Sequence, residues 1–208
     1  MALNINCPLP AALAAIPEST CPEIFGQIQK IAFQIIQTTP SFTSTTIGLK
    51  ATWTAAIAES DATKIVVSPF IMNLIVPETS LASEGGNDNT TINGIRNVRG
   101  LQTATATGNI VNVSAATRAG LQALFAYSKA PMPGLTQLWA YPILHDGRVL
   151  SYADLSGIQI YNVALTDPKL EGFNKDNVYP FSFDLLGGWS DGLVANTTNF
   201  KPYQLVNA

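Results

Sequence analysis

The sequence is short of charged residues. Asp, Glu, Lys and Arg make up 12% of 208 residues, roughly half the usual share of about 25%. Hydrophobic residues reach 47% and the mean hydropathy is +0.20, which excludes a chain kept unfolded by low hydrophobicity and high charge. So few charges leave much of the surface to Ala, Asn and 20 Thr residues. Such a surface is under-charged for a free monomer, so we expect partners to cover much of it.

Basic residues are especially scarce. The chain has 11 Lys and Arg against 14 Asp and Glu, which gives a net charge of −3 and a pI near 5.0. The densest basic group is the pair Arg96 and Arg99. Proteins that grip nucleic acid need clustered basic side chains to neutralise phosphates, and this composition argues against that class. The same composition is compatible with a protein surface past which DNA slides without binding.

Long apolar runs are missing. Uninterrupted apolar runs such as those within residues 70–76 are far shorter than the ~20 residues of a membrane span. The first six residues lack the charged and hydrophobic regions of a signal peptide. We therefore expect no membrane partner and synthesis in the cytoplasm.

Histidine and cysteine are almost absent. The single histidine, His145, stands beside Asp146-Gly147, a turn signal, so a Ser-His-Asp or Cys-His arrangement has little support. Cys7 and Cys21 are compatible with a disulfide, with two ligands of a metal, or with reduced thiols; the lack of an export signal favours thiols and leaves pairing open. We expect a protein that is not an enzyme and has no cofactor or metal.

Three further patterns give only weak evidence for a binding site. Glu84-Gly85-Gly86 lacks the strand and helix that flank a phosphate-binding loop. Glu84 and Asp88 are acceptable Ca²⁺ ligands, but without EF-hand spacing, so cation binding there stays open. The tryptophans are more typical of core or interface anchors than of a sugar-binding platform: Trp53, Trp139 and Trp189.

Residues 1–40 differ in pattern from the remainder. The first seventeen residues are rich in Pro and Ala, which prevents a continuous helix there. Apolar residues then recur at helical spacing and predict a helix over residues 22–37, with an almost uncharged opposite face: Ile24, Ile28, Ile31 and Ile35. We predict an N-terminal helical arm, residues 1–40, that serves interaction and stands outside the core.

Residues 41–208 are predicted to form one mainly β domain. Strands are expected within residues 64–76 (bent at Pro69), 101–113, 135–144, 148–152, 157–165 and 178–186, while the state of residues 41–63 stays open. One helix is expected over residues 115–128, capped by Ser114. The predicted fold is an α+β, mainly β antiparallel sandwich or barrel with one flanking helix.

Residues 77–100 are predicted to be a long loop. A loop of that length in a compact domain usually has a function. It holds flexible glycines and charges of both signs, which suits contact with an identical neighbour, and we assign that subunit contact to Glu84, Gly85, Gly86, Asp88, Arg96 and Arg99.

Two segments carry a resemblance to a known class. Residues 21–30, which read CPEIFGQIQK, resemble the N-terminal stretch of virion proteins of tailed phages, especially crAss-like and other Bacteroidetes phages. Residues 84–91, EGGNDNTT, lead to Arg99-Gly100, a Thr-rich strand and a helix, an order similar to tail-tube and head–tail ring proteins. The resemblance, one of pattern over about three-quarters of the chain, implies a virion-located homo-oligomeric ring that contacts other virion proteins and lets DNA pass through its lumen.

Three other classes remain. A capsid-decorating or receptor-binding virion protein would use the same sandwich, usually as a trimer or with a bound sugar. A carbohydrate-binding module would be monomeric and would expose Trp and Asn. A glycan-cleaving enzyme would need a pair of carboxylates in a cleft. Assembly state separates a ring former from a monomeric binder.

Overall fold

The computed structural model describes residues 26–86, 95–129, 137–168 and 176–207. Within these ranges the chain is mainly β, with eleven strands, two α-helices and one short 3-10 helix. In chain order the elements are β1 Ile28–Ile35, α1 Lys50–Ala58, β2 Ile65–Val67, β3 Met72–Ile75, β4 Leu81–Glu84, β5 Asn97–Leu101, β6 Ala104–Val111, α2 Ala115–Tyr127, β7 Leu138–Leu144, β8 Val149–Tyr152, β9 Ile158–Leu165, β10 Val178–Leu185, β11 Leu193–Asn196 and η2 Pro202–Gln204. The predicted α+β, mainly β class is confirmed.

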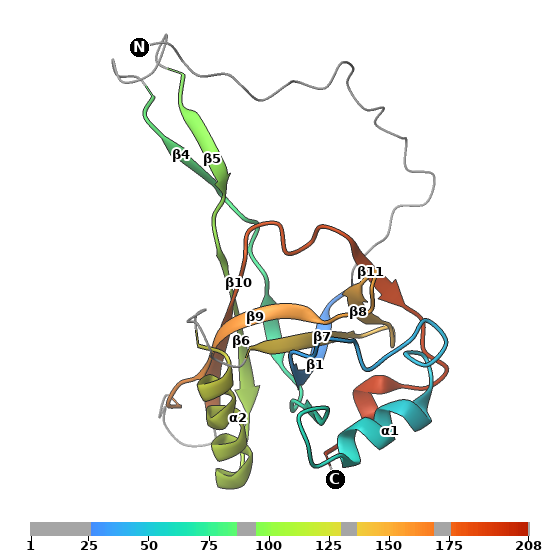
Figure 1. Ribbon diagram of the computed structural model, residues 1–208. Coiled ribbons are helices and arrows are strands. Elements are labelled where there is room, and N and C mark those ends of the chain that lie inside the picture. The colour runs from blue at the N-terminus through green and yellow to red at the C-terminus, as the bar shows by residue number, and fades with distance from the viewer. Residues whose placement is uncertain (1–25, 87–94, 130–136, 169–175, 208) are drawn as a thin grey trace.

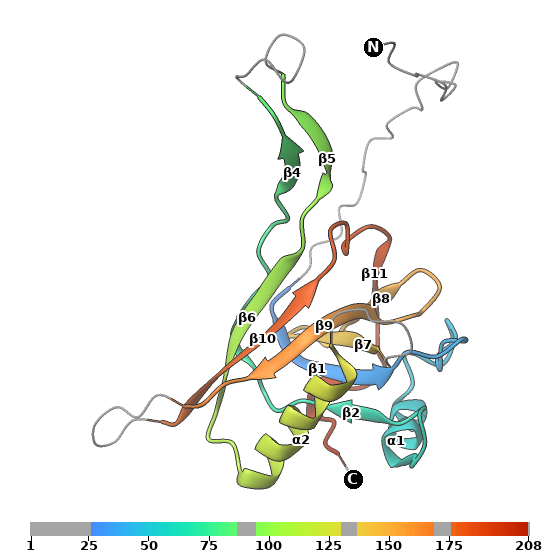
Figure 2. The same cartoon turned by 60° about the vertical axis from the view of Figure 1, so that its left-hand side comes forward.

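Nine of these strands form one antiparallel sheet. Its main order is β11-β8-β7-β9-β10-β6-β3, while β1 pairs with both β7 and β2. The sheet curls without closing into a barrel. After the bend at Pro69 the chain still bonds to β1, because the Ile71 N–H donates to the Gln29 carbonyl at 2.8 Å. The two remaining strands, β4 and β5, pair only with each other and project from the body (Figures 1 and 2).

Strands β1 and β7 divide the interior into two apolar clusters. Alternate residues of a strand point to opposite faces, so Ile31 and Phe33 of β1 lie in the first cluster and Ala32 lies in the second. Every residue of β7 is buried, because both of its faces are covered. The first cluster lies among β1, β7, β9, β10, β6 and α2, whereas the second packs α1 and the C-terminal segment against β1, β2 and β7.

The helix predicted over residues 22–37 is wrong where the structure describes it. Residues 28–35 are strand β1, and Ile31 is fully buried in the first cluster, with Ile28 and Ile35 packed against that cluster. Ile24 lies outside the described residues. Both faces of β1 are covered, so its sequence does not alternate between apolar and polar residues, and its isoleucines matched helical spacing by coincidence. The part of the proposed arm that is described therefore belongs to the core.

Most other predicted elements are confirmed. Helix α2 begins after Ser114, whose side chain accepts a hydrogen bond from the Thr117 N–H, and it packs against β9. The strand pair around Asp146-Gly147 is present, with Gly147 at φ 89° in the turn. The open stretch of residues 41–63 contains a second helix, α1, which buries Trp53 and Ile57. The tail elements β11 and η2 were not anticipated.

The second cluster holds Tyr141, whose phenol supplies a testable pH dependence. Its hydroxyl lies 3.4 Å from the Leu155 carbonyl, and the ring makes edge contacts with Phe42 and Trp53. Burial raises the pKa of Tyr141 well above its ordinary value, so the folded protein keeps the phenol protonated. In the unfolded chain the phenol ionises near pH 10, so stability from this group is complete below about pH 10 and falls at higher pH.

We expect the urea midpoint to decrease above about pH 10, so that it is lower at about pH 11 than at about pH 8, and this difference to be smaller in Tyr141→Phe. Phenylalanine keeps the ring contacts and cannot ionise. Tyr203→Phe, which changes a half-buried ring at the margin of the same cluster, is the matched control. Equal pH dependence in Tyr141→Phe and the wild type would contradict the assignment.

Candidate interaction surface

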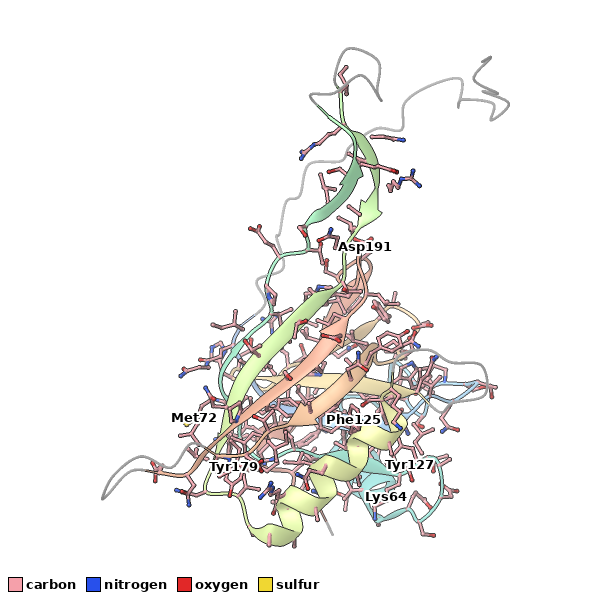
Figure 3. The ribbon with its side chains drawn as sticks, turned by 90° about the vertical axis from the view of Figure 1, so that its left-hand side faces the viewer. Lys64, Met72, Phe125, Tyr127, Tyr179 and Asp191 are labelled. Atoms are coloured by element: carbon pink, nitrogen blue, oxygen red, sulfur yellow. The ribbon has the colours of Figure 1, made fainter. Side chains whose placement is uncertain are left out.

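The hairpin formed by β4 and β5 is the most distinctive surface feature. It continues the line of β3 and β6 beyond the sheet, and it projects from the end of the body opposite both helices (Figure 1). Figure 3 shows its side chains standing clear of the body, with Asp191 at its base. The predicted long loop of residues 77–100 is therefore, in its described part, an antiparallel hairpin rather than irregular backbone.

Both faces of this hairpin are open to solvent. All five residues of β5 are exposed. The exposed side chains include large apolar ones: Leu81 at 48%, Ile95 at 69%, Val98 at 49% and Leu101 at 45%. An isolated two-stranded hairpin is at best marginally stable in water, since it has no third strand or core to pack on. These residues therefore form an exposed apolar surface that we expect a binding partner to cover.

The charged residues predicted for subunit contact lie on this hairpin. Glu84 of β4 forms an ion pair with Arg99 of β5 within the same chain. Both side chains are about two-thirds exposed, so the pair contributes little to stability, on the order of 0–1 kcal/mol. Arg96 is exposed just before β5. Asp88 lies outside the described residues, so a cation bound jointly by Glu84 and Asp88 is not tested.

The predicted glycines occupy the position where β4 ends. Gly85 has φ 71° and Gly86 has φ 111°, a region that other residues rarely adopt. A Cβ on Gly86 would also lie 3.2 Å from the Arg96 Cβ across the hairpin. Both glycines therefore set the backbone path, Gly86 also permits the close approach of the strands, and neither offers a side chain to a partner.

The base of the hairpin is held by specific contacts. The Gln102 N–H donates to the Ser80 carbonyl at 2.8 Å, and the Ser80 hydroxyl donates to Gln102 Oε1 at 2.7 Å. Leu101 lies directly on Gly187, where an added Cβ would come within 2.6 Å of the Leu101 Cβ and carbonyl oxygen. The two hydrogen bonds close the base of the hairpin, and the contact of Leu101 with Gly187 orients the hairpin on the body.

An open apolar cavity of about 290 Å³ lies beside this base. Residues that begin β1, lead into the hairpin and follow β10 line it, among them Ile28, Leu74, Val76, Trp189 and Leu193. The cavity therefore lies near the segments that join the hairpin to the body, since Val76 precedes the hairpin and Trp189 follows Gly187, which Leu101 contacts. Sequence reasoning found the segment but missed the cavity, because its lining residues come from distant parts of the chain.

The residues considered as catalytic, metal-binding or sugar-binding candidates do not come together in one site among the described residues. His145 is exposed in the turn before β8, where its backbone N–H donates to the Gln27 carbonyl at 2.9 Å. Trp53 and Trp139 are buried in the second cluster, which agrees with the prediction of core anchors, and Trp189 is half-buried at the cavity. Cys7 and Cys21 lie outside the described residues. Within residues 26–86, 95–129, 137–168 and 176–207, no group of three His, Cys, Asp or Glu side chains is placed to hold a metal ion.

The fold and this surface define a mainly β protein with a projecting, solvent-exposed hairpin. No protein-family model matches the chain, and no curated protein sequence matches it. In the part of the chain that the structure describes, no helix is long and apolar enough to cross a membrane.

Proposed function

We propose that this protein is a structural subunit of a tailed-phage virion, located in the particle, that assembles into a ring or tube of the tail or head–tail connector. The observation that carries the proposal is the projecting β4–β5 hairpin, which exposes Leu81, Val98 and Leu101 on a chain otherwise poor in surface charge. A hairpin of this kind gains stability when it packs on an identical neighbour. Rings and tubes use head-to-tail contacts, in which one patch meets a different patch of the next copy.

The outer face of the sheet is compatible with DNA passing through such an assembly. Thr105 and Thr107 of β6 are exposed, and Asp184 of β10 beside them accepts a hydrogen bond from the Thr105 hydroxyl at 2.7 Å. This face offers neutral hydroxyls and a carboxylate. Phosphates are held by Lys and Arg, so a lumen lined in this way would not retain DNA.

The first test is the mass of the purified wild-type chain in solution. We expect light scattering and native mass spectrometry to give one defined multiple of the 22.1 kDa chain mass, because the exposed hairpin is covered only in an assembly. A monomer across the accessible concentration range would contradict the proposal. That outcome would favour the alternative of a monomeric carbohydrate-binding module, whereas a closed trimer that binds glycan would favour a capsid-decorating or receptor-binding virion protein.

A further inference from the structure

Lys30 of β1 is the most deeply buried basic side chain in the described part of the chain. The residue is 6% exposed. Its ammonium nitrogen donates to the Leu205 carbonyl at 2.9 Å and lies 4.6 Å from the centroid of the Phe70 ring. An ammonium group has three N–H donors, and the carbonyl uses one of them.

The charge of Lys30 has no acidic partner among the described residues. None of the ion pairs found there includes Lys30. Burial lowers the pKa of Lys30, and no neighbouring carboxylate counteracts this effect. A buried charge is costly unless an opposite charge and further hydrogen bonds compensate for it. The Leu205 carbonyl and the Phe70 ring compensate for the charge of Lys30 only in part.

Lys30 lines an open groove of about 420 Å³ on the side of the body remote from the hairpin. Helix α2, the segment that follows β2 and the C-terminal residues lie together around it (Figure 2). Phe33, Leu121 and Leu124 provide apolar walls. Thr117 in the first turn of α2 also lines the groove, and that turn contains no acidic residue, so the positive end of the helix dipole lies at the margin of the same groove.

We propose that this groove binds an aliphatic carboxylate. The carboxylate would accept hydrogen bonds from the two remaining N–H donors of Lys30, and the aliphatic body would lie against Phe33, Leu121 and Leu124. A charge-assisted hydrogen bond is the strong kind, and the apolar walls exclude water from it. The site is remote from the hairpin, so it stands or falls independently of the proposed assembly.

The test measures the melting temperature of the full chain with hexanoate, and with hexanamide as the uncharged probe of the same length. We expect hexanoate to raise the melting temperature saturably, because a ligand that binds only the folded state stabilises it, and hexanamide to have no such effect. Sodium chloride at equal ionic strength controls for screening. Equal effects of hexanoate and hexanamide, or no saturable effect of hexanoate, would overturn the proposal.

Two variants locate the effect. Lys30→Met keeps the length of the side chain without the charge, and we expect its apparent affinity for hexanoate to fall roughly 10- to 100-fold. The control Lys64→Met, at an exposed lysine, is expected to keep the wild-type affinity.

Gly120→Leu fills the groove from α2, where an added Cβ meets nothing within 4 Å, so the fold tolerates the change. Ala119→Leu, an exposed position on the same helix that does not line the groove, is its control. Retained affinity in Gly120→Leu would place the ligand elsewhere and refute the site, even if Lys30→Met failed to fold.

Discussion

A variant in which residues 81–101 are replaced by Asn-Gly is expected to fold and to remain monomeric. Ser80 and Gln102 already share the backbone hydrogen bond of a tight turn, at 2.8 Å, so two residues suffice to join them. Within residues 81–86 and 95–101, the described part of the removed segment, no residue belongs to either apolar cluster, and Leu101 contacts Gly187 at the base. Assembly would be lost because the exposed hairpin is the proposed contact between copies.

Light scattering measures this loss, and far-UV circular dichroism with a urea titration checks the fold. Val98→Ser is the sharper point variant, because Val98 is half-exposed on the hairpin and no buried neighbour depends on it. Its matched control is Val206→Ser, at a residue that is 75% exposed near the other end of the body. An unchanged assembly after removal of residues 81–101 would refute the role assigned to the hairpin.

Replacing Phe33 by Ala is expected to destabilise the fold by about 3–5 kcal/mol, a large fraction of a typical domain's stability. Phe33 is 1% exposed, lies in the first cluster, and its ring meets that of Phe181 edge-on with centroids 6.5 Å apart. Alanine would leave a cavity between β1 and β10 that the surrounding strands cannot close. Urea denaturation monitored by circular dichroism gives the loss in free energy of unfolding.

This result distinguishes a core strand from an interaction arm. Were residues 26–40 an appendage, Phe33→Ala would weaken assembly and leave the free energy of unfolding unchanged. Gln29→Ala serves as the control, because Gln29 is only half-buried on the same strand and the change keeps the backbone carbonyl that Ile71 uses. Similar losses of stability in both variants would contradict the specific role of the Phe33 ring.

Local patterns in the sequence were sufficient to predict the helices and strands that have one face toward solvent and one toward the core. Strand β6 alternates buried and exposed residues along its length, since one face meets the first cluster and the other carries Thr105 and Thr107. Helix α2 combines a Ser114 cap with an apolar stripe that includes Leu121 and Leu124. In both cases the spacing of the apolar residues matches the period of the backbone, so the element can be predicted without knowing which elements it packs against.

The hairpin shows where such patterns stop being informative. Strands β4 and β5 are exposed on both faces, so no core selects alternate residues and their sequences lack a strand period. Residues 77–100 therefore suggested a loop. Glu84 and Arg99, to which a subunit contact was assigned, lie on the hairpin and pair with each other. That assigned contact itself remains a prediction.

By itself the sequence determined a mainly β fold, its capped helix and most of its strand boundaries, because each depends on residues close together along the chain. Tertiary structure decided three other features. Strand β1 is extended because clusters on both of its faces bury it, and the direction of the hairpin depends on Leu101 meeting Gly187. The groove at Lys30 exists because β1, α2 and Leu205 come together from positions up to 175 residues apart, a separation at which no local pattern carries information.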